Sequence, residues 1–483
     1  MKKSKLLLSP LFLTLATCGG GSSSETNVPP QFTSGNALTF VENGSQALQV
    51  TATDSPRQTV SFSISGGADA ARFAISATGA LSFAAAPNFE SPADSDGDNV
   101  YQLVITASDG LTTTNQALNV TVTNSREGIS VRRLFTGFNE PVAITRIPDD
   151  NRLLIAEKGG SIWFFDPTNN SRTLFAVIER APGSQNILLL GLNGLLSITS
   201  QRDRSSINTL YCAIEDQFGN IRIIGFVINS LSRGILFNSE ILIIPRGGSP
   251  FPPIASLSTG LDNNVYLSTG DSGGQNGSSN AQNDGSRLGK LIRIRENLDP
   301  FAGASPQFFA FDTLAKGLQQ PRSLSFFGND ILIGDQGQSR FGEINRLALN
   351  ATGVNFGWPF REGNISNMSG EPAGLTDPAL QVAFGTGPKQ GRAIMLGQVF
   401  ASSALDLRDK FVFSDTNGSI WTVPISRLSS GATLMATDFE RRNEDFAPDF
   451  GTISGIIGYT TGNDGRAYLL DSDGEVFEVV ATS

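Results

Sequence analysis

The sequence predicts an all-β protein in which a β-sandwich is followed by a six-bladed β-propeller. Three observations lead to this prediction. Short apolar runs alternate with clusters of Gly, Asn, Asp and Ser, which is typical of strands joined by turns. The 483 residues exceed the usual size of one domain, so we expect more than one core. From residue 128 onward, one strand-turn-strand pattern occurs six times.

The charge and the amino-acid usage exclude several classes of function. The net charge is −10, and Lys and Arg are not clustered, so we expect no nucleic-acid partner. The sequence contains no histidine. This excludes zinc sites and Ser-His-Asp triads, and it removes the usual general base near neutral pH.

The N-terminus resembles a bacterial lipoprotein signal. Lys2, Lys3 and Lys5 precede an apolar run, Leu6 to Leu15, that is too short to span a bilayer stably, and Cys18 follows. Residues 1–17 are therefore predicted to be a signal peptide, with Cys18 lipidated. Residues 18–30, which include GGGSSS, are predicted to be a flexible tether. The alternative is an ordinary secretory signal. We expect a membrane-anchored protein of the periplasm, the outer membrane or the cell surface.

Residues 31–124 are predicted to form the sandwich. Apolar and polar residues alternate in four segments, as expected of half-buried strands, and turn clusters separate them. The segments are Ala47–Ala52, Thr59–Ile64, Tyr101–Ile105 and Ala117–Val122.

The order of short motifs in this region resembles that of cadherin repeats. The motifs include Val41-Glu42-Asn43, Asn88-Phe89-Glu90 and Ala107-Ser108-Asp109. The resemblance implies that calcium is bound by four carboxylates, those of Glu42, Asp54, Glu90 and Asp109. The closing Asp-x-Asn-Asp linker is replaced by Thr123-Asn124-Ser125, which predicts weak binding.

A separate loop, Asp94-Ser95-Asp96-Gly97-Asp98, places three carboxylates at alternate positions. Such a loop can wrap a cation, and it can equally be a solvated acidic turn.

Residues 128–481 are predicted to form the propeller. The six repeats start near Leu153, Leu210, Val265, Ile331, Phe411 and Ala467, which are 55 to 80 residues apart. This spacing suits four-stranded blades with loop insertions. The run LYCAI in the second repeat predicts that Cys212 is a small buried hydrophobe.

The segment from Ile331 to Gly363 carries a second resemblance. It contains Glu343-Ile344-Asn345, then Gly353-Val354-Asn355-Phe356-Gly357-Trp358-Pro359, then Glu362-Gly363. Together these resemble the DEIN…G-x-N-[YF]-G-W-P…EG signature of the glucose/sorbosone dehydrogenases, soluble sugar dehydrogenases that use pyrroloquinoline quinone. The resemblance covers essentially all of 128–481 and implies a propeller that oxidises aldoses.

The residues that such an activity requires are replaced in this chain. The catalytic histidine of the family would fall at Phe251–Ile254, and its sugar-contacting polar residue would fall at Leu192. The Arg-Asn pair that holds the quinone reads Gln319-Gln320, and no arginine lies near Gly455–Gly458. We therefore expect neither a bound quinone nor a catalytic residue.

The segment Gln336-Gly337-Gln338 matches the family's calcium-coordinating loop, whose ligands are backbone carbonyls. Carbonyl ligation tolerates side-chain changes, so calcium is predicted here. The alternative is a hairpin turn of the kind that any blade needs. Lys290 and Arg293 are interpreted as charges at a blade edge rather than cofactor ligands.

Three classes of function follow. The favoured one is a surface lipoprotein whose calcium-binding sandwich and degenerate propeller recognise carbohydrate or a cell-surface protein, as in adhesion. The alternative is an active quinone-dependent sugar dehydrogenase. The third is a hydrolase that uses carboxylates such as Glu157, Asp271 and Asp335, although no spacing singles out a pair.

Overall fold

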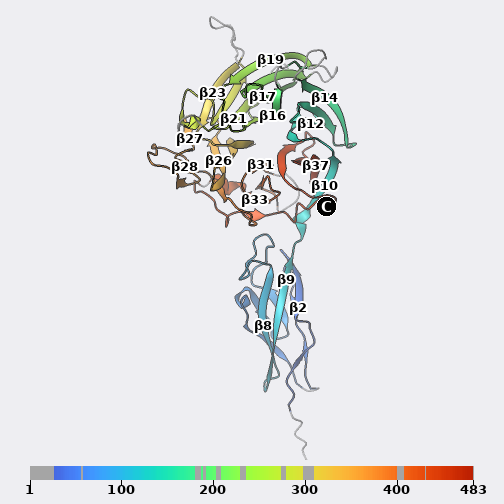
Figure 1. Ribbon diagram of the computed structural model, residues 1–483. Helices are drawn as coiled ribbons and strands as arrows, with labels where there is room; N and C mark the ends of the chain where they lie inside the picture. Colours follow the sequence, from blue (N-terminus) through green and yellow to red (C-terminus); the bar gives the residue numbers. More distant parts are fainter. Residues whose placement is uncertain are drawn as a thin grey trace, which may run out of the picture. The chain divides into compact units, whose positions relative to one another are not determined.

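The computed structural model describes residues 27–55, 58–179, 187–188, 192–202, 208–228, 235–273, 279–296, 309–399, 407–429 and 431–481. The chain divides into two compact units, Met1–Thr123 and Asn124–Ser483. Each unit is built almost entirely of strands (Figure 1). The predicted signal peptide, the lipidated Cys18 and most of the tether lie outside the described residues. Within the described part, no helix is long and apolar enough to cross a membrane.

The first unit is a β-sandwich. Its larger sheet has the order β2-β9-β8-β5, in which β2 runs parallel to β9 and the other pairs are antiparallel. Its smaller sheet has the order β3-β7-β6, and β1 and β4 form a separate pair. The strands are β1 (Gln31–Phe32), β2 (Ala37–Val41), β3 (Leu48–Gln49), β4 (Ala52–Thr53), β5 (Ser61–Gly66), β6 (Phe73–Ile75), β7 (Ala80–Phe83), β8 (Val100–Ser108) and β9 (Thr113–Thr123), with a short 3-10 turn, η1 (Ala70–Arg72).

Alternation along the strands builds the sandwich core. In β8, Tyr101, Leu103, Ile105 and Ala107 are buried, and each is flanked by more exposed residues. Phe83 packs edge-on against Phe40 and Tyr101, with ring centroids 4.9 and 5.0 Å away. The period-two pattern of the sequence therefore becomes one apolar layer between two sheets.

The second unit is a ring of six sheets (Figure 1). Blade one comprises β11 (Pro141–Ile147), β12 (Asp150–Glu157), β13 (Ser161–Asp166) and β14 (Ser171–Glu179), with β15 (Ile187–Leu188) beside it. Blade two comprises β16 (Leu192–Arg202), β17 (Asn208–Asp216), β18 (Ile221–Ile228) and β19 (Ile235–Ile244). Blade three comprises β20 (Ala255–Thr259), β21 (Val265–Thr269), β22 (Lys290–Glu296) and β23 (Phe309–Lys316), joined by β27 (Val354–Asn355).

The other three blades follow the same plan. Blade four comprises β24 (Pro321–Phe327), β25 (Asp330–Gln336), β26 (Phe341–Ala348) and β30 (Leu380–Ala383), and a side hairpin holds β28 (Arg361–Glu362) and β29 (Ile365–Ser366). Blade five comprises β31 (Ile394–Val399), β32 (Lys410–Asp415), β33 (Ile420–Pro424) and β34 (Glu440–Arg441). Blade six comprises β35 (Ile456–Thr461), β36 (Ala467–Asp471) and β37 (Glu475–Ala481), and its outer strand is β10 (Ile129–Thr136) from the start of the unit. Short 3-10 turns are η2 (Arg126–Gly128), η4 (Asn280–Gln282) and η5 (Ile425–Ser429). The innermost strands of the six sheets are β11, β16, β20, β24, β31 and β35, whose residues line the central channel.

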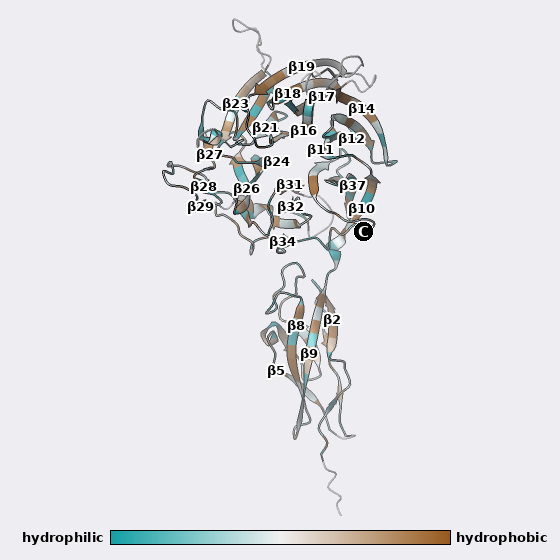
Figure 2. Cartoon of the chain, viewed as in Figure 1, coloured by the Kyte–Doolittle hydropathy of each residue, from teal (hydrophilic) through white to brown (hydrophobic). Residues whose placement is uncertain are grey.

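Apolar residues fill the spaces between neighbouring blades, and Figure 2 shows hydrophobic residues in brown along the strands. One cluster joins blades one and two through residues such as Ile162, Phe164, Cys212 and Phe226. Cys212 is fully buried there, and burial raises the pKa of its thiol, so it behaves as the inert apolar residue expected from the sequence.

The predicted fold class is confirmed, and the six predicted repeat starts fall in β12, β17, β21, β25, β32 and β36, the second strand of each blade. One interpretation was wrong. Lys290 does not lie at an exposed blade edge; it is only 1% exposed, and its Nζ donates to the carbonyls of Asn280, Ala281 and Leu288. Burial lowers the pKa of Lys290 to about 8. Its role is to satisfy carbonyls of the loop around η4.

Candidate functional site

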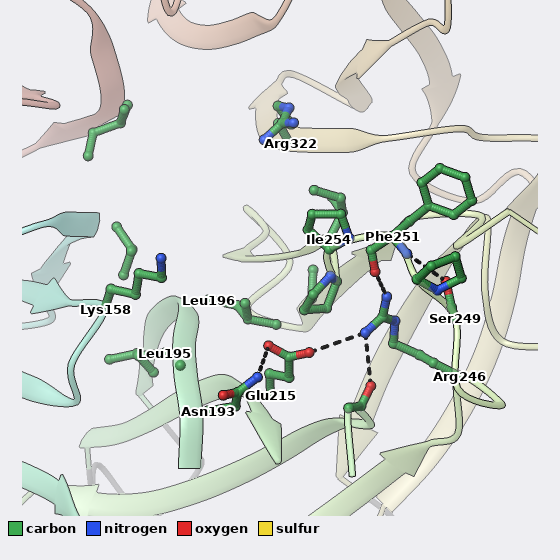
Figure 3. Close-up of a pocket in the computed structure, with 18 of the residues that line it drawn as sticks. Lys158, Asn193, Leu195, Leu196, Glu215, Arg246, Ser249, Phe251, Ile254 and Arg322 are labelled. Atoms are coloured by element: carbon green, nitrogen blue, oxygen red, sulfur yellow. Dashed lines mark hydrogen bonds and ion pairs between the residues drawn. The ribbon is translucent and has the colours of Figure 1, made fainter. Parts of the chain in front are cut away.

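One cavity of the propeller has a volume of about 790 Å³. It lies at the face where the second strands end, as shown by Lys158, Glu215 and Thr416 in its lining. The segment from Gly248 to Ala255 forms one wall, and Leu195, Leu196, Met395 and Ile457 add apolar surface. Figure 3 shows Lys158, Arg322, Ile254 and Glu215 around the open space.

A narrower channel of about 460 Å³ shares Val142, Leu196, Arg322, Met395 and Ile457 with this cavity. Residues of all six innermost strands line it, so it follows the axis of the ring. Serine hydroxyls in its wall join neighbouring blades. Ser325 donates to the carbonyl of Gly397 at 2.8 Å, and the Leu257 backbone N–H donates to Ser197 at 3.1 Å. Small polar residues of the inner strands therefore hold the ring together.

Arg246 organises one wall of the cavity. It is buried, and its guanidinium donates to the carbonyls of Gly219 and Phe251, to Oγ of Ser272 and to the carboxylate of Glu215. These four groups come from the end of β17 and the turn after it, the segment after β19 and the turn after β21. Figure 3 shows the contacts with Glu215 and Phe251. A single planar side chain thus fixes three loops, which suits the five donors of arginine.

The Glu215 carboxylate lies between two donors. Arg246 approaches it at 3.3 Å, and the Asn193 amide donates to it at 2.9 Å. The Glu215 side chain is 16% exposed, so the carboxylate is still reached from the cavity. A carboxylate has about four acceptor positions, which leaves capacity for the hydroxyl of a ligand.

Arg322 lies where the cavity meets the channel. Its Nε donates to Oε1 of Gln336 at 2.8 Å, and its Nη2 donates to Oε1 of Gln320 at 3.2 Å. Burial lowers the pKa of Arg322. The residue remains a cation, because the ordinary pKa of arginine is far above neutral.

The position expected for a catalytic histidine also lies in the cavity wall. Pro252, Pro253 and Ile254 line the cavity, and none carries a titratable group. The equivalent of the sugar-contacting residue, Leu192, opens β16, and its side chain lies outside the described residues.

The acids considered for a hydrolase have structural roles. A buried acid lies within two residues of the end of each second strand. All six are at most 7% exposed: Glu157, Asp216, Asp271, Asp335, Asp415 and Asp471. Every one accepts at least one backbone N–H, for example from Asn139, Gln319, Ala393 and Ser454 just before an innermost strand. The acids repeat with the fold and hold its turns, so no pair of them marks an active site.

The predicted calcium loop is tightly packed. Gln336 ends β25, Gly337 is buried and Gln338 is exposed. A Cβ added at Gly337 would lie 2.4 Å from the Phe341 carbonyl oxygen and 2.5 Å from Oε1 of Glu362. Glu362 accepts the backbone N–H groups of Ser339 and Arg340. These contacts form a hairpin turn, and calcium binding by the backbone carbonyls of this loop stays a prediction.

Two buried acids lie beside this loop. Glu343 in β26 is paired with Asp335 in β25. Its carboxylate accepts the Gly363 backbone N–H at 2.5 Å and the Asn345 side-chain amide N–H at 3.1 Å. Burial raises the pKa of Glu343 to about 7. Burial, followed by the charge of Glu343, raises the pKa of Asp335 well above its ordinary value.

The four acids predicted to bind calcium in the sandwich do not meet at one place. Carboxylate oxygens of Glu42 and Glu90 lie within 4.8 Å of each other. Asp109 lies at the opposite end of β9, which has 11 residues and spans roughly 35 Å. Asp109 therefore does not converge with Glu42 and Glu90, because β2 ends beside the last residue of β9, whereas Asp109 precedes the first.

Asp109 has partners of its own. Its carboxylate accepts the backbone N–H groups of Thr112 and Leu111 and the Asn27 amide. The hydrogen bond from the Thr112 backbone N–H is the main cause of the lowered pKa of Asp109. Asp54 lies nearby, because the side-chain amide nitrogen of Gln58 donates to the carboxylates of both Asp54 and Asp109. In the acidic loop, oxygens of Asp94, Asp96 and Asp98 lie within 4.8 Å of one another.

The sequence pattern did not indicate Arg246, Glu215 or Arg322 as site residues. Arg246 and Glu215 precede turns in blade two, and only the closure of the ring brings them to a shared cavity. Arg322 stands three residues after Gln319, so a cation lies near the place where the family motif predicted a loss of positive charge. A search for arginine at the positions next to the family motif could have found Arg322.

Comparisons with known proteins agree with this architecture. The sequence model of the family described as Glucose / Sorbosone dehydrogenase matches residues 138–382, just over half of the chain. No significant match to a curated protein was found.

Several solved structures are similar. The apo form of the soluble aldose sugar dehydrogenase of Escherichia coli is 17% identical, with a TM-score of 0.52, and the match covers 73% of this chain and 99% of that one. An oxidoreductase of Thermus thermophilus described as a glucose dehydrogenase is 18% identical, with a TM-score of 0.52, covering 73% and 100%. Another glucose dehydrogenase is 17% identical, with a TM-score of 0.53, covering 73% and 99%. At these identities the structures show a shared fold.

Proposed function

The chain belongs to the glucose/sorbosone dehydrogenase family, and we propose that its propeller holds a sugar in the cavity between Lys158, Arg322 and the segment from Gly248 to Ala255. Of the roles expected from the sequence, the comparisons favour a sugar-dehydrogenase propeller over cell adhesion, for which they give no support. A sugar is therefore the ligand that the family supports best.

The composition of the cavity wall carries this proposal. The volume of about 790 Å³ lies in the range of small-molecule sites. Proline, leucine and isoleucine side chains form much of the wall, and a few polar groups converge on it from Asn193, Glu215 and Arg322. A sugar presents apolar C–H faces and a ring of hydroxyls. Such a mixed surface is matched by an apolar wall with placed donors and acceptors.

Oxidation of that sugar is a second candidate function, favoured by family membership. A tricarboxylate quinone would find positive charge at Arg322 and Lys158, which fits its carboxylates. The reaction also needs a group that accepts the hydroxyl proton. Histidine is absent from the sequence, and Pro252 and Ile254 offer no substitute. The residues therefore do not fit the quinone chemistry.

Calorimetric titration of the full chain with neutral aldoses tests the sugar site. We expect saturable heat with glucose or galactose, and weaker binding by Asn193→Ala, which removes an exposed amide at the cavity. Asn169→Ala is a matched control, because Asn169 lies in the turn between β13 and β14 at the other end of its blade. Absence of binding by every aldose tested would contradict the proposal.

Calcium binding by the sandwich is also proposed, at Glu42 and Glu90. Both carboxylates are buried, and their oxygens lie within 4.8 Å. Carboxylate oxygens gathered in this way are ligands that calcium prefers in proteins. Lipid anchoring through Cys18, an envelope location and a cell-surface protein partner remain predictions from the sequence.

A further inference from the structure

The balance of charge in the sugar cavity is positive. Three cationic side chains line it, those of Lys158, Arg246 and Arg322, against one acid, Glu215. Glu215 and Arg246 form an ion pair at 3.3 Å, with side chains 16% and 3% exposed, and thereby neutralise each other. What remains is the charge of Lys158 and Arg322.

Arg322 lacks a carboxylate partner among the described residues. Its guanidinium donates to two neutral amide oxygens, those of Gln336 and Gln320. Asp335 is the acid whose charge acts on the Arg322 guanidinium, but burial raises the pKa of the Asp335 carboxyl group. A partly buried cation whose hydrogen-bond partners are all neutral is costly to maintain, and an anionic ligand offsets that cost.

The free part of the guanidinium suits a carboxylate. Nε and one terminal nitrogen of Arg322 are occupied by the amide oxygens, and Nη1 has no hydrogen-bond partner within the described part of the chain. Each terminal nitrogen carries two hydrogens, so Nη1 and the second hydrogen of Nη2 remain available as donors. One planar edge matches one planar carboxylate group in the bidentate manner.

Lys158 adds a second, adaptable cation. Its Nζ lies 3.9 Å from Glu140, and both side chains are more than half exposed, so this pair is weak. Its backbone is fixed by bonds to Glu140 and Leu195, while its long side chain can turn toward the cavity. Figure 3 shows Lys158 and Arg322 on different sides of the open space, with no acid drawn between them.

We propose that the sugar held in this cavity is an acidic one, a uronic or aldonic acid, with its carboxylate on Arg322 and Lys158 contributing attraction. This inference rests on the proposed sugar site and adds the chemical class of the ligand. Glu215 and Asn193, at the floor of the cavity, then remain to accept and donate hydrogen bonds to hydroxyls.

Paired titrations of the full chain test the inference. Glucose is compared with glucuronate and galactose with galacturonate, in low salt and without quinone. We expect each acid to bind at least about tenfold more tightly than its neutral partner, and the preference to shrink as salt is added. Arg322→Gln should reduce the preference to under about threefold, because it weakens the binding of the acids more than that of the neutral sugars. Lys158→Gln should reduce it by a smaller factor.

Two controls make the outcomes distinct. Arg408→Gln removes an equal charge from the connection between β31 and β32, at the opposite end of the blades, and should change nothing. Thermal unfolding of each variant verifies folding, and Lys158→Gln changes an exposed residue that the fold does not need.

Any of four results would overturn the inference. Equal binding of acidic and neutral sugars refutes the acidic class and leaves the sugar site standing. Binding of no sugar refutes the proposed function itself. Because pyrroloquinoline quinone also carries carboxylates, it is titrated separately; if the quinone binds in an Arg322-dependent way and glucuronate does not bind, the cation serves a cofactor. A phosphorylated sugar that binds more tightly than glucuronate would replace carboxylate with phosphate.

Discussion

Asp335 and Glu343 are directly paired residues on the neighbouring strands β25 and β26, and both are buried. Two carboxyl groups this close in an apolar interior cannot both ionise at low cost. The pair therefore makes blade four sensitive to pH.

The first prediction is that the propeller loses stability as pH rises from about 4.5 to about 7. Glu343 has a pKa of about 7 in the folded state, above its ordinary value of 4.5. The folded state therefore holds its proton in a range where the unfolded chain releases it, and stability falls with rising pH. The difference is on the order of 3 kcal/mol between the two limits.

Urea unfolding of Glu343→Gln at pH 5 and pH 8 measures this effect. The variant should show a flatter dependence on pH than the natural protein. Glu444→Gln, at an exposed position in the same unit, should retain the natural dependence. A natural protein as stable at pH 8 as at pH 5 would contradict the argument.

The second prediction concerns Gly337. A methyl group there would lie 2.4 Å from the Phe341 carbonyl oxygen, so the hairpin must shift. Gly337→Ala should destabilise the protein by roughly 1 to 3 kcal/mol. Gly159→Ala is the matched control, because nothing lies within 4 Å of a Cβ at that turn. Equal unfolding midpoints for the two variants would show that the loop has more room than its contacts indicate.

The third prediction is that the protein supplied with pyrroloquinoline quinone and calcium does not reduce a dye with aldoses. The reason is the lack of a proton acceptor at Pro252 and Ile254. Turnover with glucose on the order of 1 per second or faster would refute this expectation and establish the dehydrogenase function.

The fourth prediction is that calcium stabilises the sandwich. With a dissociation constant of roughly 0.1 to 1 mM, 10 mM calcium should add about 1.4 to 2.7 kcal/mol. Calorimetric unfolding of the full chain measures the shift. Glu90→Gln should reduce it, and Asp96→Asn should reduce it only if the acidic loop is the site instead. An unmoved transition in 10 mM calcium would refute calcium binding by this unit.

The fifth prediction concerns Cys18. Cys18→Ala should move the protein from the membrane fraction to the soluble fraction, because the GGGSSS tether has no membrane affinity. Immunoblotting of the fractions measures the distribution. A variant that still sediments with membranes would show that the preceding apolar run is the anchor.

Much of the fold could be predicted because its signals are local. A second strand such as Ile331–Ile333, with Asp335 after it, reveals itself by an apolar run and a turn acid, and six such runs define the ring. The sandwich strands were likewise visible by alternation. These patterns depend on neighbours along the chain.

The site was less predictable because its partners are distant in sequence. The place of Asp109 at the far end of β9 follows from strand order, which the motif did not contain. The sequence predicted Lys290 as a charge at a blade edge, whereas in the structure its Nζ is enclosed by carbonyls of the loop around η4. Arg246 acquires its role only when three loops meet at its guanidinium.

The pairing of β10 with β37 sets the order in which the propeller can be completed. Ile129, at the start of the unit, finds its partner at Ala481. During synthesis the first strand must therefore wait until almost the whole unit has been made, and the preceding blades remain an open arc with an unpaired edge. The sandwich, whose partners all lie within its own residues, is complete long before then. The interval between these two events is the period in which the chain most needs protection from aggregation.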